Sequence, residues 1–229
     1  MSIIAVLLDL DGTLINSLSD ISDSVNNMRI ELGLEKLTEQ KIKTFIGKGI
    51  NNLIKKSLED HKDNYNGENN ILFSKAKKLF SEYYIDSNGK QTVLYDKVID
   101  GLEDLKNKGF TLSIVTNKPF IPTYQILKKF NIEKLFSVIT CGDTCKRNKP
   151  YPDQILFTCD KLGISTNKTI MIGDSSNDVI AAKKAKTAAV LVMPYGYHNK
   201  NNIMELNADG VIKDLTKASK WIYSHNETH

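Results

Sequence analysis

Two aspartates in the stretch Asp9-Leu10-Asp11-Gly12-Thr13-Leu14 have the residue type and spacing of groups that do chemistry. They directly follow the apolar run Ile3-Ile4-Ala5-Val6-Leu7-Leu8, which is typical of a buried parallel strand. Side chains two residues apart on a strand point the same way, so the two carboxylates can converge while the Leu10 carbonyl stays free to coordinate a cation. Two like charges this close need a counter-ion or a shared proton. A polar turn after the strand is the alternative interpretation.

Two other stretches offer groups that suit a phosphate. Thr116-Asn117 ends the run Ser113-Ile114-Val115 and precedes a helix expected near Pro119, so it offers a hydroxyl, an amide and a helix N-terminus. An ordinary helix N-cap is the alternative for this pair. Lys149, in Asn148-Lys149-Pro150, is a point charge for phosphate or a plain surface lysine.

A second acidic pair follows the apolar stretch Met171-Ile172-Gly173. Asp174 and Asp178 lie at the start of a predicted helix. They either face a site at the end of the preceding strand or are acids favoured by the helix dipole.

Apolar periodicity predicts helices only between residues 16 and 90. The expected helices cover Ser17 to Leu32, Thr38 to Phe45, a segment from Ile50 to Leu58 and one from Leu72 to Tyr83. The polar stretch from Asn64 to Asn70 is predicted to be a loop. We therefore expect a small unit of the four-helix bundle type.

From about residue 98 helices and strands alternate, which predicts a parallel sheet with helices on both faces. The expected strands are Thr111 to Thr116, Val138 to Cys141, Thr169 to Ile172, Ala188 to Val192 and a short one near Val211. The expected helices are Val98 to Lys108, Ile121 to Phe130, Asp153 to Leu162, Ser176 to Ala185 and a last one ending around Tyr223. The fold class is α/β and Rossmann-like, with a core domain of residues 1–15 and 91–229 and an inserted helical cap of residues 16–90.

The composition favours an ordinary globular protein. Its 229 residues are 41% hydrophobic and 25% charged, and the net charge of +4 comes from scattered lysines. Nucleic acid is not an expected partner, because no basic block is interleaved with aromatic residues. No stretch has the length of a membrane span, and the N-terminal apolar run is not a secretion signal, so no membrane partner and a cytoplasmic location are expected. Three cysteines, Cys141, Cys145 and Cys159, are expected to be structural thiols.

Four polar stretches follow one another along the chain: Asp9-Leu10-Asp11-Gly12-Thr13, Thr116-Asn117, Lys149, and Gly173-Asp174 with Asp178. Together, in this order, they resemble the haloacid dehalogenase superfamily of phosphohydrolases. Within it, the chain looks like the bacterial phosphoglycolate phosphatase group, on the stretches Val115-Thr116-Asn117-Lys118-Pro119, Lys149-Pro150-Tyr151-Pro152-Asp153, Met171-Ile172-Gly173-Asp174-Ser175 and Tyr195-Gly196-Tyr197. One departure is Ala185-Lys186, where the family usually has Ala-Gly after a helix.

The resemblance implies a role for each site residue. Asp9 would be the nucleophile that forms an aspartyl-phosphate, and Asp11 the general acid and base. Mg²⁺ would be the cofactor, held by Asp9, the Leu10 carbonyl and Asp174, with Asp11 as a further candidate ligand. The substrate-binding residues would be Gly12, Thr116, Asn117 and Lys149, of which Thr116 and Lys149 also act in catalysis. Asp178 would orient Lys149. Ser175 would likewise support the site without contacting the substrate or the metal.

The expected reaction is Mg²⁺-dependent hydrolysis of a small anionic phosphomonoester, 2-phosphoglycolate, by a monomer or homodimer. An inorganic pyrophosphatase, a sugar-phosphate phosphatase and a phosphomutase of the same superfamily are the alternatives. A non-enzymatic binding protein is disfavoured, because all the acids and the lysine are present. Lys48, in Gly47-Lys48-Gly49, is a candidate for reading the substrate's carboxylate or is a solvated turn residue.

Overall fold

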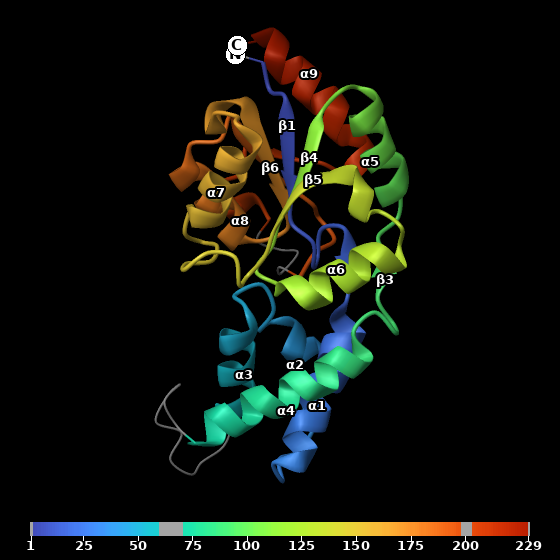
Figure 1. Cartoon of the computed structure of the whole chain (residues 1–229), viewed down its shortest axis with the longest axis vertical. Helices are drawn as coiled ribbons and strands as arrows, with labels where there is room; N and C mark the ends of the chain where they lie inside the picture. The colour runs from blue at the N-terminus through green and yellow to red at the C-terminus, as the bar shows by residue number, and fades with distance from the viewer. Residues whose placement is uncertain (1, 60–70, 198–202, 229) are drawn as a thin grey trace. The chain divides into compact units, whose positions relative to one another are not determined.

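The structure is a computed structural model that describes residues 2–59, 71–197 and 203–228. It divides into two compact units, one of residues 1–16 and 94–229 and the other of residues 17–93 (Figure 1). The second unit is therefore inserted in the chain after the first strand of the first unit. The short strands β2 (Ile15–Asn16) and β3 (Val93–Leu94), which form a two-stranded sheet, lie at the two points where the chain passes between the units.

The first unit is built on a six-stranded parallel sheet in the order β5-β4-β1-β6-β7-β8. Its strands are β1 (Ala5–Leu8), β4 (Thr111–Val115), β5 (Phe136–Thr140), β6 (Thr169–Gly173), β7 (Ala189–Val192) and β8 (Gly210–Val211). The central strands are buried on both faces, which explains their continuous apolar sequences.

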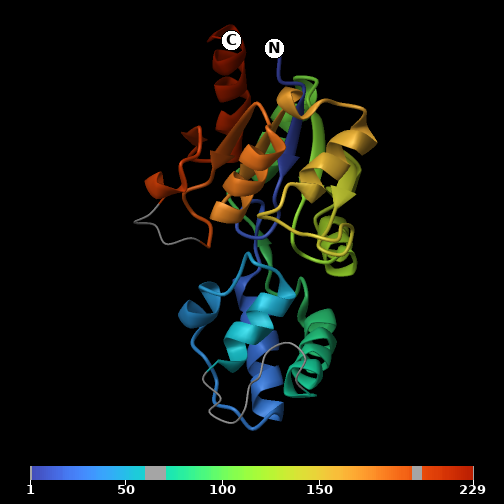
Figure 2. The ribbon, with the colours of Figure 1, turned by 90° about the vertical axis from the view of Figure 1, so that its left-hand side faces the viewer.

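Helices cover both faces of this sheet. The helices are α5 (Val98–Asn107), α6 (Phe120–Lys129), α7 (Asp153–Leu162), α8 (Ser176–Ala185) and α9 (Ala218–Thr228). Leu7, Met171 and Val190 pack with α7 and α8 on the face toward the viewer in Figure 2. Their strand neighbours Val6 and Ile170 pack with α5, α6 and α9 on the other face. The side-chain alternation of a strand thus separates two apolar layers.

The topology fixes where a ligand can bind. The chain runs from β1 to β4 and β5 on one side and then returns to β6 on the other side of β1. Polar residues at the carboxyl ends of β1 and β6 therefore meet at a topological switch point, where open α/β sheets bind ligands.

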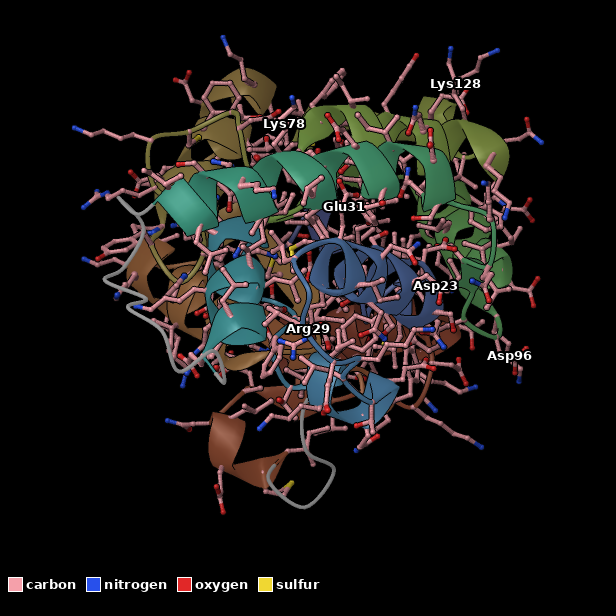
Figure 3. All side chains as sticks on the ribbon, turned by 90° about the horizontal axis from the view of Figure 1, so that it is seen from below. Asp23, Arg29, Glu31, Lys78, Asp96 and Lys128 are labelled. Carbon is pink, nitrogen blue, oxygen red and sulfur yellow. The ribbon has the colours of Figure 1, made fainter. Side chains whose placement is uncertain are left out.

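The second unit contains α1 (Leu18–Glu31), α2 (Glu39–Lys43), α3 (Ile50–Leu58) and α4 (Ile71–Ser87) around its own apolar core. Arg29 of α1 is buried and donates hydrogen bonds to the carbonyls of Glu35 and Ser57 (Figure 3). The buried Asp20 carboxylate accepts from the amides of Gly89, Gln91 and Thr92. The polar groups buried in this unit thus serve to hold its connecting segments.

The expected α/β fold class is confirmed. Most elements lie within one or two residues of the predicted bounds, but α4 and α9 extend to Ser87 and Thr228, four and five residues beyond the expected ends. The predicted loop from Asn64 to Asn70 lies outside the described residues, and the bundle detail of the second unit stays a prediction because α2 has only 5 residues. Among the described helices, none has both the length and the apolar character needed to cross a membrane.

Lys186 occupies the place where the resemblance to the family predicts glycine. It is the C-cap of α8 and adopts the left-handed conformation, with φ 57° and ψ 47°. A side chain with a Cβ is unfavourable in this region by about 1–2 kcal/mol, whereas glycine is not. Lys186 therefore ends α8 in the left-handed conformation that glycine would adopt, but its Cβ makes this conformation less favourable.

We expect Lys186→Gly to raise the free energy of unfolding by about 1 kcal/mol, because the change removes the Cβ from a left-handed position. The matched control is Lys183→Gly, an exposed position inside α8, which should lower it by about 1 kcal/mol. Urea denaturation of the three proteins measures both effects. A loss of stability in both variants would contradict the prediction.

Candidate active site

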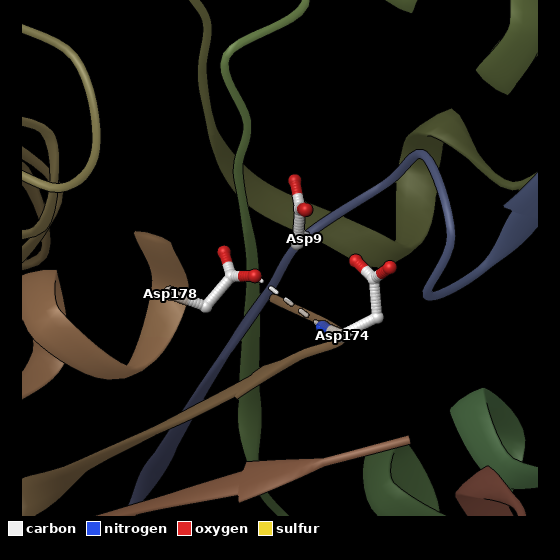
Figure 4. Close-up of side chains that lie close together, drawn as sticks. All are labelled: Asp9, Asp174 and Asp178. Atoms are coloured by element: carbon white, nitrogen blue, oxygen red, sulfur yellow. Dashed lines mark hydrogen bonds between the residues drawn. The ribbon is translucent and has the colours of Figure 1, made fainter. Parts of the chain in front are cut away.

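Three buried carboxylates meet at the carboxyl edge of the sheet (Figure 4). Asp9 follows β1, Asp174 follows β6, and Asp178 lies in the first turn of α8. One oxygen of each lies within 4.8 Å of the others, a grouping that can hold a metal ion. The neighbouring parallel strands β1 and β6 bring Asp9 and Asp174 together, and α8, which follows β6, adds Asp178.

Lys149 is the cation of this cluster. Its Nζ lies 2.9 Å from Asp9 Oδ1 and 2.6 Å from Asp178 Oδ1, and it donates to the Val115 carbonyl at 2.7 Å. Its side chain is only 2% exposed. The interpretation of this residue as a surface lysine is therefore wrong, and the sequence could not exclude it because Lys149 lies in a loop.

The backbone of Lys149 is also held in place. Asn117 accepts from the Lys149 amide at 3.0 Å and donates to its carbonyl at 2.9 Å. Gln154, which the sequence analysis did not single out, accepts from the same amide and donates to the carbonyls of Thr116 and Cys141. The amide side chain of Asn117 therefore positions Lys149, and its expected contact with substrate stays a prediction.

Asp178 is occupied by protein donors. Its Oδ1 accepts from Lys149 Nζ. Its Oδ2 accepts from the Ser175 hydroxyl at 2.7 Å and from the amides of Asp174 and Ser175. The Ser175 side chain in turn caps α8. The contact between Asp178 and Lys149 is the one the sequence analysis expected, and Asp9 and Asp174 are left as the carboxylates better placed for a cation.

Asp11 has a lysine of its own. Lys118 Nζ lies 3.2 Å from Asp11 Oδ1, and the lysine side chain is 2% exposed. The sequence assigns Lys118 no role, because spacing alone does not show that the loop after β4 turns its side chain back to β1. Asp11 lies outside the group of three acids, so its role as a metal ligand stays a prediction.

The Leu10 carbonyl does not stay free for a cation. It accepts hydrogen bonds from the amides of Thr13, Leu14 and Ile15. The prediction of this carbonyl as a ligand is therefore wrong. The cause is the tight turn after Asp11, which folds the following amides back onto residue 10 and which strand periodicity does not reveal.

Burial governs the electrostatics of the cluster. It raises the pKa of Asp9 from 3.8 to about 6, with Lys149 opposing and Asp178 adding to the shift. Burial and the charges of Asp178 and Asp9 also raise the pKa of Asp174 well above its usual range. Burial lowers the pKa of Lys149, but the attraction of Asp178 and Asp9 outweighs this, so its pKa is raised. The carboxylates are short of positive charge, which is the condition for binding a cation.

Two glycines make room for Asp174. A Cβ at Gly12 would lie 2.4 Å from Asp174 Oδ2, and a Cβ at Gly196 would lie 2.2 Å from it. Gly12 also has a left-handed φ of 87°. The Tyr197 amide donates to Asp174 Oδ2 at 2.6 Å. The Tyr195-Gly196-Tyr197 motif therefore supports Asp174, a function that the sequence analysis did not assign.

The other predicted site residues lie as follows. Thr116 is buried at the end of β4, and its hydroxyl accepts from the Lys118 amide at 3.2 Å. Lys48 belongs to the second unit, on an exposed turn between Gly47 and Gly49, both of which have positive φ. The proposed contacts of Thr116 and Lys48 with substrate stay predictions.

Comparison with protein families identifies the chain. The model of the haloacid dehalogenase-like hydrolases matches residues 6–192. The chain belongs to this family. The resemblance inferred from the sequence is therefore confirmed, and the acid and lysine contacts described above belong to a hydrolase.

Curated relatives of this hydrolase span nearly its whole length. It is 35% identical to the phosphoglycolate phosphatase of Nitrosococcus oceani, over 92% of each chain, and 37% identical to that of Pasteurella multocida, over 91% of this chain and 93% of the relative. The crystal structure of a predicted phosphoglycolate phosphatase from Haemophilus somnus 129pt superposes with a TM-score of 0.88 at 32% identity, covering 96% of this chain and 98% of that one. The expectation of a phosphoric monoester hydrolase is confirmed.

We expect the affinity of this hydrolase for a divalent cation to fall with pH. With a pKa of about 6, Asp9 is only about one-tenth ionised at pH 5, so binding there should be about tenfold weaker than at pH 7.5. Calorimetric titration of the metal-free protein with Mg²⁺ at the two pH values measures this. Equal affinity at both would contradict a carboxylate site with a raised pKa.

The metal-free protein gives a second readout. Since the native state holds the Asp9 proton more tightly than the unfolded state, this contribution to stability is present below the unfolded pKa of 3.8 and is lost as pH rises through about 6. Asp9→Asn removes the titrating group and should flatten this part of the stability curve.

Proposed function

We propose that this hydrolase removes the phosphoryl group from a small anionic phosphomonoester, 2-phosphoglycolate, with Mg²⁺ as cofactor. The observation that carries the proposal is the contact of 2.9 Å between Lys149 Nζ and Asp9 Oδ1, beside Asp174. It joins a nucleophilic carboxylate, a buried cation for phosphoryl oxygens and a further acid for a metal at one sheet edge.

Asp9 is the nucleophile in this proposal. One of its carboxylate oxygens attacks phosphorus and the ester P–O bond breaks, which leaves an aspartyl-phosphate and the alcohol. Water then attacks the phosphorus, inorganic phosphate leaves, and the Asp9 carboxylate is restored. Lys149 holds the carboxylate in place before attack and neutralises phosphoryl charge during it.

Asp11 moves the proton. It protonates the leaving oxygen in the first step and takes a proton from water in the second, so each step balances. The 3.2 Å contact with Lys118 Nζ supports this division, because it fixes the Asp11 carboxylate separately from that of Asp9. Lys118 is in this view a positioning residue for Asp11.

We place the metal at the carboxylates whose oxygens are least occupied by hydrogen-bond donors of the protein. Asp9 and Asp174 would hold Mg²⁺, which when bound neutralises phosphoryl charge as a Lewis acid. The Thr116 hydroxyl and the backbone near Asn117 and Gly12 would contact the phosphoryl oxygens. The ligand atoms fit a hard cation, since they are all oxygens. The raised pKa values of Asp9 and Asp174 show that these oxygens also bind a proton more tightly than usual.

The substrate is proposed from the relatives, which are phosphoglycolate phosphatases at 35–37% identity. Release of phosphate from 2-phosphoglycolate, pyrophosphate, sugar phosphates and nucleotides, measured side by side with Mg²⁺, tests the assignment. The highest kcat/KM is expected for 2-phosphoglycolate. A higher value for pyrophosphate would favour the pyrophosphatase alternative, and transfer of the phosphoryl group to a sugar would favour a phosphomutase. Turnover in excess chelator would contradict the metal requirement.

We expect Asp9→Asn to abolish turnover, with a loss of several orders of magnitude, because the amide keeps the shape and removes the nucleophile. The matched control is Asp23→Asn on the exposed surface of α1, which should retain the parent rate. Circular dichroism checks that both variants are folded. Activity of Asp9→Asn within tenfold of the parent would rule out Asp9 as the nucleophile.

We expect Lys48→Ala to lower kcat/KM for 2-phosphoglycolate by roughly tenfold or more, the loss of one charge-assisted hydrogen bond to the substrate's carboxylate. An uncharged aryl phosphate ester has no such carboxylate and should be turned over at an almost unchanged rate. Lys43→Ala, on α2 of the same unit, is the control for general loss of positive charge. An equal drop for both substrates, or none for either, would contradict a role of Lys48 in substrate choice.

A further inference from the structure

A pocket of about 510 Å³ lies away from the acid cluster, beside the edge strand β8 and the helix α9. Its volume is that of a site for a small organic ligand. None of its lining residues contributes to the groups proposed for catalysis. The lining residues are Val211, Ile212, Lys213, Lys217, Lys220, Trp221, Ser224 and His225.

The pocket is positively charged. Three of its lining residues are lysines, and in the described part of the chain no salt bridge is formed by Lys213, Lys217 or Lys220. The nearby Asp214 attracts Lys217, but its carboxylate already accepts from the amide and hydroxyl of Thr216. Positive charge thus exceeds negative charge around this pocket, which favours an anionic ligand.

Two flat rings lie beside the lysines. The Trp221 and His225 rings are stacked, with centroids 4.9 Å apart and an interplanar angle of 13°. A Cβ at Gly210 would lie 2.8 Å from Trp221 Nε1, so the glycine of β8 lets the indole pack close to the strand. The tryptophan is half-buried and still lines the pocket, which gives a fixed aromatic surface for a planar group.

We propose that this pocket binds a nucleoside phosphate, with its base against the stacked pair of the Trp221 and His225 rings and its phosphates toward the three lysines. The aromatic surface accounts for a planar base, and the lysines for a group with more than one negative charge. Either feature alone is common on protein surfaces. Their combination in one pocket is what selects this class of ligand.

The simpler explanation concerns the sheet edge. Lysines at an edge strand prevent pairing with another strand, and Lys213 lies two residues after the end of β8. Lys217 and Lys220 are not on that strand, however: Lys217 lies in the 3₁₀ turn η5 (Leu215–Lys217) and Lys220 in α9. Protection of the edge does not require them or the aromatic pair.

The chain provides its own probe, because Trp221 is its single tryptophan. Titration of the full chain with ADP in the presence of a chelator, which prevents turnover, should change the tryptophan fluorescence in a saturable way with a Kd below about 1 mM. Adenosine and pyrophosphate, titrated separately, should each bind at least about tenfold more weakly than ADP. The ADP affinity should also fall as NaCl is added.

Variants separate this pocket from the acid cluster. Lys217→Gln with Lys220→Gln should raise the Kd for ADP about tenfold or more, whereas Lys106→Gln, an exposed lysine of α5, should not change it. Trp221→Leu, followed by calorimetry, should weaken ADP binding, and Asp9→Asn should leave it unchanged. Circular dichroism identifies any variant that does not fold.

Two results would overturn the proposal. The first is the absence of saturable ADP binding to the parent protein, which would leave the lysines as edge protection only. The second is equal affinity for pyrophosphate and ADP, or loss of ADP binding in Asp9→Asn, which would show that the anion binds without the rings or at the acid cluster.

Discussion

The burial of three carboxylates around one ammonium group is the constraint on which the rest of the active edge depends. Asp9, Asp174 and Asp178 share a small volume, and Lys149 Nζ lies in direct contact with Asp9 and Asp178. Removal of carboxylates from water is costly, so each one needs hydrogen bonds or a counter-charge. The Tyr197 amide at Asp174, the Ser175 amide at Asp178 and the Lys149 ammonium group at Asp9 meet this requirement.

The two lysines at this edge divide the acids into two sets. Lys149 is fixed at both ends, by Asn117 and Gln154 at its backbone and by Asp178 at its Nζ. Lys118 contacts Asp11 instead, and its carbonyl accepts the Gly142 amide, which fixes its loop. Each carboxylate of the first motif thus has its own cation, so two acids only two residues apart lie in different charge environments.

The sequence predicted the features that depend on regular local patterns, and missed those that depend on the path of turns and loops. The strand ends at Asp9 and Asp174 follow from local periodicity, and the contact between Asp178 and Lys149 follows from the family resemblance. The occupied Leu10 carbonyl depends on the turn after Asp11, and the Lys118 contact depends on the path of a loop between distant strands. Periodicity carries no information on either, because both depend on backbone angles outside regular elements.

A hydrogen-bond donor of the protein contacts every acid of the cluster. The fold therefore holds these carboxylates in place without the help of a bound metal. Lys149 contacts Asp9, the Tyr197 amide contacts Asp174, and Asp178 is held by Ser175. These contacts do not offset the burial of the carboxylates, since the pKa values of Asp9 and Asp174 remain raised. A proton can therefore occupy the site where a cation would bind, and the two compete for the same oxygens. Because the contacts already fix the carboxylates, a cation would exchange with a proton and would not have to build the site.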